Sequence, residues 1–254
     1  VDYNKTNGLW EKSYGNQPLY TPSGTGAPIA AAPVITQTGG HLYVVAGTGQ
    51  YFSLADISPS VQNYALGLFA DQGPITDADL LGQSFIDNGK EVDAIYSSNK
   101  TLTQKIYQVS QNAIQNHHKG WRLTLLKGQA IVSQPAIRRN KVATFTAVRT
   151  PPTGNVCSVN GATALIAVSL QNGGQYNLPA FDTNKDGRFD GNDTLGGMLE
   201  VGGIIAPVGT SREATVNGNT SIQNILAGDT GTFAAPMNTF EDSLIRRISW
   251  REIF

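Results

Sequence analysis

Short hydrophobic runs separated by turn residues recur along this chain of 254 residues. Each run has the length of a β-strand, is rich in β-branched and aromatic residues, and is bounded by Gly, Asn or Pro. The clearest runs are HLYVVA at 41–46, WRLTL at 121–125, VATFTAV at 142–148 and ALIAV at 164–168. This pattern predicts an all-β protein with few short helices.

Two hairpin-like units resemble each other. The run APVI at 32–35 leads through a Gly-Gly turn into LYVV at 42–45, and QPAI at 134–137 leads through RRN into VATF at 142–145. A third unit begins at APV, 206–208. A degenerate repeat of hairpins suggests the radially arranged blades of a β-propeller.

Four other segments give weaker signals. Thr76 is a suitable N-cap with acidic residues after it, which predicts one short helix over 76–83. Residues 100–116 fit a helix or a strand. The long polar stretch 209–229 predicts an extended loop, and the alternation at 247–253 predicts a final strand.

Composition supports a turn-rich β fold, and the net charge argues against one class of partner. Charged residues make up only 15% of the chain, with 28 Gly and 12 Pro. A formal net charge of −1 argues against nucleic acid as the partner. No apolar run approaches the length of a membrane-spanning helix. The first residues, VDYN, are neither a signal peptide nor an initiator methionine, so we expect a processed chain or a fragment of a longer protein.

The segment 182–193, DTNKDGRFDGND, has the spacing of a calcium-binding loop. Ca²⁺ takes about six to eight oxygen ligands, so such a loop must fold several of them onto one centre. Gly187 would allow the sharp turn at loop position 6. The candidate ligands are the side chains of Asp182, Asn184, Asp186 and Asp190, the carbonyl of Arg188, and Asp193 in place of the usual Glu.

Two questions about this segment stay open from its residues alone. Asp, Asn and Gly favour turns, so the stretch could be a polar surface turn without a metal. The flanking residues 176–180 and 194–197 are poor helix formers, which predicts a loop between strands and not a helix–loop–helix. Calcium would then rigidify a loop and would not open a sensor groove.

In five segments, the loop 182–193 among them, the chain resembles the C-terminal domain of the PilY family, the tip-associated assembly proteins and adhesins of type IV pili. The segments follow the family's order over most of the chain. They are 33–52 with its Gly-Thr-Gly turn, 63–71 followed by Asp79-Leu80, 120–135 followed by Cys157, the loop 182–193, and 247–252. The chain departs from the family at Gln50, where Arg is common, and at Phe69-Ala70, where Trp-Asp is common.

The resemblance implies a β-propeller of roughly seven blades, of which residues 1–254 would supply three or four. The missing N-terminal portion would hold the other blades and an adhesion domain. From its residues alone Cys157, the one cysteine, is either an inert thiol or has a partner cysteine in that portion. The resemblance also implies an extracellular or cell-surface location at the pilus tip or outer membrane of a bacterium. Its partners would be minor pilins and, through adhesion, host or surface receptors.

The implied function is calcium binding that supports pilus biogenesis, extension against retraction, and twitching motility, with no enzymatic activity. Two alternatives are a quinone-dependent propeller dehydrogenase and a dockerin-like calcium module. The first needs a central acidic pocket and stronger blade motifs; the second needs a second copy of the loop, which the sequence lacks.

Other chemistry finds little support in the sequence. The adjacent histidines His117 and His118 have no third ligand at a useful spacing. The carboxylates Asp71, Asp77 and Asp79 are close in sequence, but helix capping accounts for two of them. Neither a nucleophile-elbow motif nor a phosphate-binding loop occurs.

Overall fold

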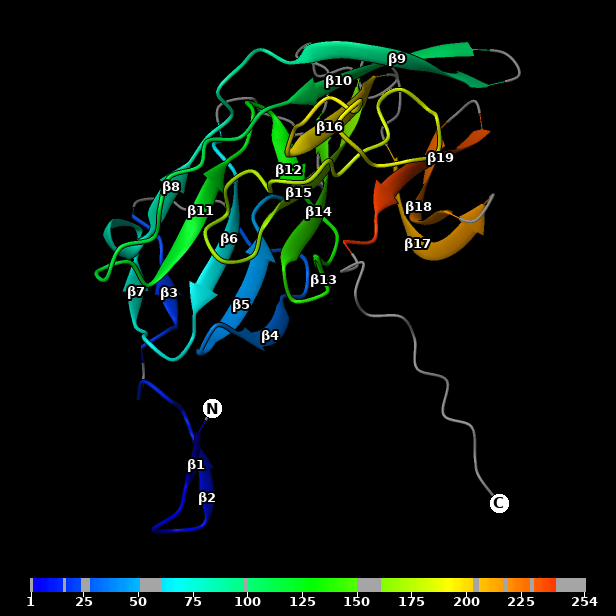
Figure 1. Ribbon diagram of the computed structural model, residues 1–254. Helices are drawn as coiled ribbons and strands as arrows, with labels where there is room; N and C mark the ends of the chain where they lie inside the picture. The colour runs from blue at the N-terminus through cyan, green and yellow to red at the C-terminus, as the bar shows by residue number, and fades with distance from the viewer. Residues whose placement is uncertain are drawn as a thin grey trace, which may run out of the picture.

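The computed structural model describes residues 2–15, 17–23, 28–50, 61–97, 100–149, 161–202, 206–216, 219–228 and 231–240. Within these ranges the chain is built from strands, with one short 3-10 turn (Figure 1). The all-β prediction is confirmed. Cys157 and the expected final strand at 247–253 lie outside the described residues.

Two large sheets form the centre of the fold. The first is five-stranded, in the order β4-β5-β6-β11-β8, with β8 parallel to β11. Its strands are β4 (Val34–Thr38), β5 (His41–Gly47), β6 (Tyr64–Phe69), β8 (Leu81–Gln83) and β11 (Gly120–Thr124).

The second sheet is seven-stranded, in the order β12-β14-β15-β16-β10-β9, with β13 also paired to β14. Its strands are β9 (Lys90–Ser97), β10 (Lys100–Tyr107), β12 (Gln129–Ile131), β13 (Ala136–Arg138), β14 (Val142–Arg149), β15 (Ala162–Ser169) and β16 (Met198–Gly202).

Three smaller sheets complete the chain. Figure 1 shows β17, β18 and β19 to one side of the seven-stranded sheet, and the N-terminal hairpin β1–β2 projecting from the body. Their strands are β17 (Ala206–Val216), β18 (Asn219–Gly228), β19 (Gly231–Asn238), β1 (Asp2–Asn4), β2 (Leu9–Glu11), and the parallel pair β3 (Tyr20–Thr21) and β7 (Ile75–Thr76).

The sheets pack face to face, as neighbouring propeller blades do. Strand β15 shows this clearly because it is buried on both faces. Ile166 and Val168 join the core shared with the five-stranded sheet, whereas Leu165 and Ala167 join the core shared with β19. A third core, around Leu66, covers the other face of the five-stranded sheet.

The three hairpin units recognised in the sequence fall in three different sheets. The first is the β4–β5 hairpin, the second is β13–β14, and the third begins β17. The turn of the second hairpin uses Arg139 and Asn140 at φ 49° and 53°, the left-handed region that a tight two-residue turn requires. Each copy of the sequence repeat therefore begins a hairpin in a different sheet.

Two sequence predictions are wrong. Residues 209–216 and 219–228 are not an extended loop, because they lie in β17 and β18, which pair antiparallel from Thr210 to Val216 after a register shift that follows Ala206. The short helix expected over 76–83 is only a 3-10 turn, η2 (Asp77–Asp79), between β7 and β8. The expected capping is present, since Asp79 accepts hydrogen bonds from the backbone N–H and hydroxyl of Thr76, each at 2.8 Å. The ambiguous segment 100–116 begins with strand β10.

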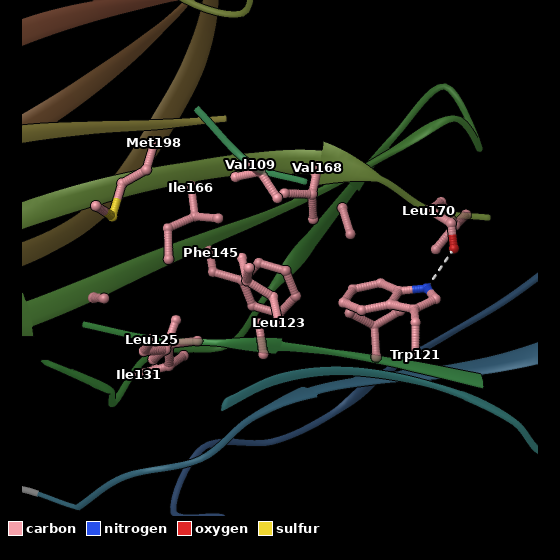
Figure 2. Close-up of a cluster of buried hydrophobic side chains, with 14 of the residues drawn as sticks. Val109, Trp121, Leu123, Leu125, Ile131, Phe145, Ile166, Val168, Leu170 and Met198 are labelled. Carbon is pink, nitrogen blue, oxygen red and sulfur yellow. Dashed lines mark hydrogen bonds between the residues drawn. The ribbon is translucent and has the colours of Figure 1, made fainter. Parts of the chain in front are cut away.

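Trp121 joins the two large sheets. It lies on β11 in the five-stranded sheet, is fully buried, and donates a hydrogen bond of 2.8 Å to the carbonyl of Leu170 at the end of β15 (Figure 2). Its ring meets Phe145 edge to face, with 6.5 Å between the centroids. Trp121 therefore fills the interface between the two sheets, and its indole N–H has a hydrogen-bond partner on the other side of that interface.

Glycine at position 67 makes room for this indole. A Cβ built on Gly67 would lie 2.3 Å from Trp121 Cε2, and one on Gly173 would lie 2.3 Å from Cε3. We expect Gly67→Ala to lower the free energy of unfolding by about 1–3 kcal/mol, because the indole must move within a packed core. Gly82→Ala in the same sheet, where nothing lies within 4 Å, is the matched control. Equal urea midpoints for the two variants would contradict this role for Gly67.

Candidate metal centre

The loop 182–193 connects β15 to β16 and lies beside β19. Phe181, directly before it, is buried and forms a β-bridge with Met237 of β19. The N–H of Asn238 donates to the carbonyl of Ala180 at 2.9 Å. Beyond the loop, Gly197 donates to the carbonyl of Tyr107 at 2.9 Å. Both ends of the loop are thus fixed to different sheets, and no helix flanks it, as predicted.

The loop backbone turns where the sequence predicts. Gly187 has φ 80° and Lys185 has φ 61°, both in the left-handed region. The N–H of Gly187 donates to Asp182 Oδ2 at 3.0 Å, so the first loop residue accepts from the sixth. A Cβ on Gly187 would meet nothing within 4 Å, so glycine is favoured here for its backbone conformation.

Three candidate ligands bond to the backbone two residues further on. Asn184 Oδ1 accepts from the N–H of Asp186 at 3.0 Å, and Asp186 Oδ1 accepts from the N–H of Arg188 at 2.8 Å. Asp190 Oδ1 accepts from Asn192 at 2.8 Å. These are Asx turns, which a polar turn without metal would also make. They explain the loop's shape but do not distinguish between the two interpretations.

Asp193 closes the loop. Its Oδ1 accepts from the N–H of Thr183 at 2.7 Å and its Oδ2 accepts from the N–H of Asp190 at 3.1 Å. Its side chain is buried, with a residue exposure of 8%. The shorter Asp in place of Glu therefore clamps the two ends of the loop together, a role that the spacing alone did not indicate.

Asp182 is the residue that a polar turn does not explain. Its Oδ1 is buried and has no hydrogen-bond partner among the described residues. Burial raises the pKa of this carboxyl, and the charges of Asp193 and Asp186 raise it further, against lowering hydrogen bonds from the N–H groups of Gly187 and Lys185. A buried, unpaired carboxylate oxygen among other carboxylates is a site whose charge a cation would balance.

The carboxylates are near one another without forming a compact cluster. The charges of Asp182, Asp186 and Asp193 interact, yet the described part of the chain contains no group of three or more His, Cys, Asp or Glu positioned to hold a metal ion. Arg188 contributes a backbone carbonyl to the expected ligand set and Asn184 an amide oxygen, which are oxygen ligands of a kind that Ca²⁺ accepts. The loop can therefore hold calcium only if carboxylate, amide and backbone carbonyl oxygens all serve as ligands, with Asp182 among them.

The other carboxylates and histidines singled out in the sequence serve structural roles. His118 Nδ1 accepts from the N–H of Gln115 at 2.9 Å. The three carboxylates at and near η2 pair with three different basic side chains. These pairs are Asp71–His41 at 2.9 Å, Asp77–Arg122 at 3.3 Å and Asp79–Lys119 at 3.7 Å. They do not converge on one centre.

The described residues define an all-β domain of packed sheets, with an Asx-rich loop that connects two strands of the seven-stranded sheet and lies beside β19. No family model matches the chain, and no curated protein sequence matches it either. Among solved structures, the C-terminal domain of PilY1 from Pseudomonas aeruginosa is similar, with a TM-score of 0.63 over 89% of this chain and 20% sequence identity.

This match confirms the fold implied by the sequence resemblance. The chain has a PilY C-terminal-like fold, and it spans 48% of the length of the PilY1 structure. In the part of the chain that is described, no helix is long and apolar enough to cross a membrane.

Proposed function

We propose that the chain is a calcium-binding domain of a type IV pilus tip protein, which supports pilus biogenesis, twitching motility and adhesion at the bacterial surface. The fold shared with the PilY1 C-terminal domain supports the association with pili. The buried Asp182 Oδ1, which lacks a partner within the described residues, is the observation that supports calcium. The proposed ligands are Asp182, Asn184, Asp186 and Asp190, with the carbonyl of Arg188 and, through its free lone pairs, Asp193.

The anchoring of the loop suggests how calcium would act. Bound Ca²⁺ would supply the positive charge that offsets the repulsion between Asp182, Asp186 and Asp193. Phe181, next to Asp182, is paired with Met237 on β19, an edge strand of the three-stranded sheet β17-β18-β19. A fixed loop would therefore hold β19 against the seven-stranded sheet, and a partner that binds this arrangement would be coupled to calcium.

The proposed partners are minor pilins at the pilus tip and, for adhesion, host or surface receptors. The proposed location is the cell surface, and the rest of the tip protein would supply further blades and an adhesion domain. We propose no catalytic role. Neither the quinone-dependent dehydrogenase nor the dockerin-like module gains support from a particular contact among the described residues.

Asp182→Asn separates calcium binding from local stability. In EDTA the substitution is expected to raise the thermal midpoint by about 2 °C at neutral pH, because it removes a partly buried charge that lies near other carboxylates and whose Oδ1 has no hydrogen-bond partner among the described residues. The same substitution is expected to weaken calcium binding by about tenfold or more, because the site loses a charged ligand. Calorimetric scans in EDTA and calcium titrations check the two effects.

The stability difference should depend on pH in a defined direction. The folded-state pKa of Asp182 is raised above its ordinary value of 3.8, so its protonated form favours folding. That contribution is complete below pH 3.8 and disappears as the pH rises through the raised pKa. Wild type and Asp182→Asn should therefore have similar stability in acid and diverge toward neutral pH in EDTA. A constant difference from acid to neutral pH would contradict an uncompensated carboxylate at this position.

A further inference from the structure

A pocket to which no residue of the loop 182–193 contributes lies at the end of the interface between the two large sheets. Its volume is about 350 Å³, near the lower limit for small-molecule sites. One wall comes from β5 and β6, and another from the turn after β15. The lining residues on which the argument depends are His41, Tyr43, Phe69, Ser169, Gln171 and Asn172.

Aromatic rings form the wall from β5 and β6. His41 stacks on Phe69 with 4.5 Å between centroids and 7° between planes, and Tyr43 meets Phe69 edge to face at 4.9 Å. Phe69 and Tyr43 are buried, whereas the His41 side chain keeps 32% of its surface exposed. The ring surface that a ligand would meet is therefore mainly that of His41, supported from behind by Phe69.

The orientation of His41 is fixed by Asp71. His41 Nδ1 lies 2.9 Å from Asp71 Oδ2, and Asp71 Oδ1 accepts from the N–H of Leu42 at 3.1 Å. Partial burial raises the pKa of Asp71, but the hydrogen bonds from His41 and Leu42 hold it below its ordinary value. Asp71 thus stays ionised beside His41 and occupies Nδ1, so Nε2 is the ring nitrogen left for a ligand.

The opposite wall supplies neutral polar groups. The Ser169 hydroxyl and the Gln171 amide make no side-chain hydrogen bond to any residue that the structure describes. Asn172 is held in place, since its Oδ1 accepts from the N–H of Gly174 at 3.1 Å. The lining therefore combines a ring surface with hydroxyl and amide groups that both donate and accept, and the nearby carboxylate of Asp71 is already paired with His41.

From this lining we propose that the pocket binds one neutral sugar unit of a glycan. The C–H face of a pyranose ring would pack on His41, while its hydroxyls would bond to Gln171, Ser169 and His41 Nε2. Hydroxyl groups match these partners because each can donate and accept, and a neutral ligand leaves the His41–Asp71 pair undisturbed. The small volume and half-exposed rim predict weak binding, with a Kd on the order of 1 mM for a monosaccharide.

Saturation-transfer NMR on the whole chain tests this site. The probes are the methyl glycosides of glucose, galactose, mannose and N-acetylglucosamine, with a Tyr- or Phe-containing tripeptide as the competing ligand class. At least one glycoside should receive saturation from the wild type. Gln171→Ala should weaken its binding by about fivefold, and His41→Phe, which keeps the stack on Phe69 but removes Nε2, should do the same.

Gln108→Ala is the matched control, because Gln108 is an exposed glutamine that does not line the pocket. It should bind the glycoside as tightly as the wild type. The proposal is overturned if no glycoside binds, if Gln171→Ala binds as well as Gln108→Ala, or if only the tripeptide binds, which would make the pocket a peptide site.

Discussion

Replacing Trp121 with alanine is expected to lower the free energy of unfolding by about 4 kcal/mol. The side chain is fully buried between the two large sheets, and its removal leaves a cavity that neither sheet can close alone. The carbonyl of Leu170 also loses the 2.8 Å hydrogen bond from Nε1 inside the core. Urea unfolding followed by circular dichroism measures the change.

Two further variants make this test specific. Trp121→Phe should have a smaller effect, about 2 kcal/mol, because it keeps part of the packing but loses the hydrogen bond to Leu170. Ile86→Ala removes a large side chain that is 60% exposed and should change stability by less than about 0.5 kcal/mol. A Trp121→Ala variant no less stable than Ile86→Ala would show that the sheets do not pack through this residue.

Calcium is expected to stabilise the wild-type chain, with a gain of about 2.7 kcal/mol when the free ion is at about 100 times its Kd. The reason is that the folded loop holds Asp182, Asp186 and Asp193 within range of each other's charge, so the folded chain should bind the ion more tightly than the unfolded chain. Thermal unfolding in calcium and in EDTA measures the gain. Asp186→Ala should remove most of it, because it deletes a central ligand.

Glu91→Ala is the control for this comparison. Glu91 lies on β9, its side chain is 75% exposed, and the substitution removes one negative charge without touching the loop. Its response to calcium should equal that of the wild type. If Glu91→Ala lost the calcium response to the same extent as Asp186→Ala, the effect would come from net charge and not from the loop.

The sequence predicts the buried strands well because the hydrophobic pattern of a strand lies within a few adjacent residues. In β14 and β15 most residues are apolar and most are buried, so length and β-branching suffice to identify them. The sequence pattern does not identify the hairpin β17–β18, because the polar residues of this segment predict a loop. Two sequence features do indicate a hairpin. They are the dipeptide Asn217-Gly218, which is typical of hairpin turns, and the β-branched residues around it.

The sequence predicts the internal spacing and the turn of the loop 182–193, but not its contacts with the rest of the fold. The spacing of Asp182, Asn184 and Asp186 and the turn at Gly187 are properties of adjacent residues, so the sequence predicts them directly. The bridge from Phe181 to Met237 joins residues far apart in the chain, and no local pattern reveals it. The sequence does not predict the pocket for the same reason, because its lining residues come from four distant parts of the chain, near 41, 69, 114 and 171.

Isothermal titration of Ca²⁺ into the wild-type chain and into Asp186→Ala, at the same pH and salt, tests the central proposal most directly. We expect one calcium ion bound per wild-type chain and no measurable heat of binding from Asp186→Ala at the same concentrations. Equal binding by the two proteins, or none by the wild type, would contradict a calcium site in the loop 182–193.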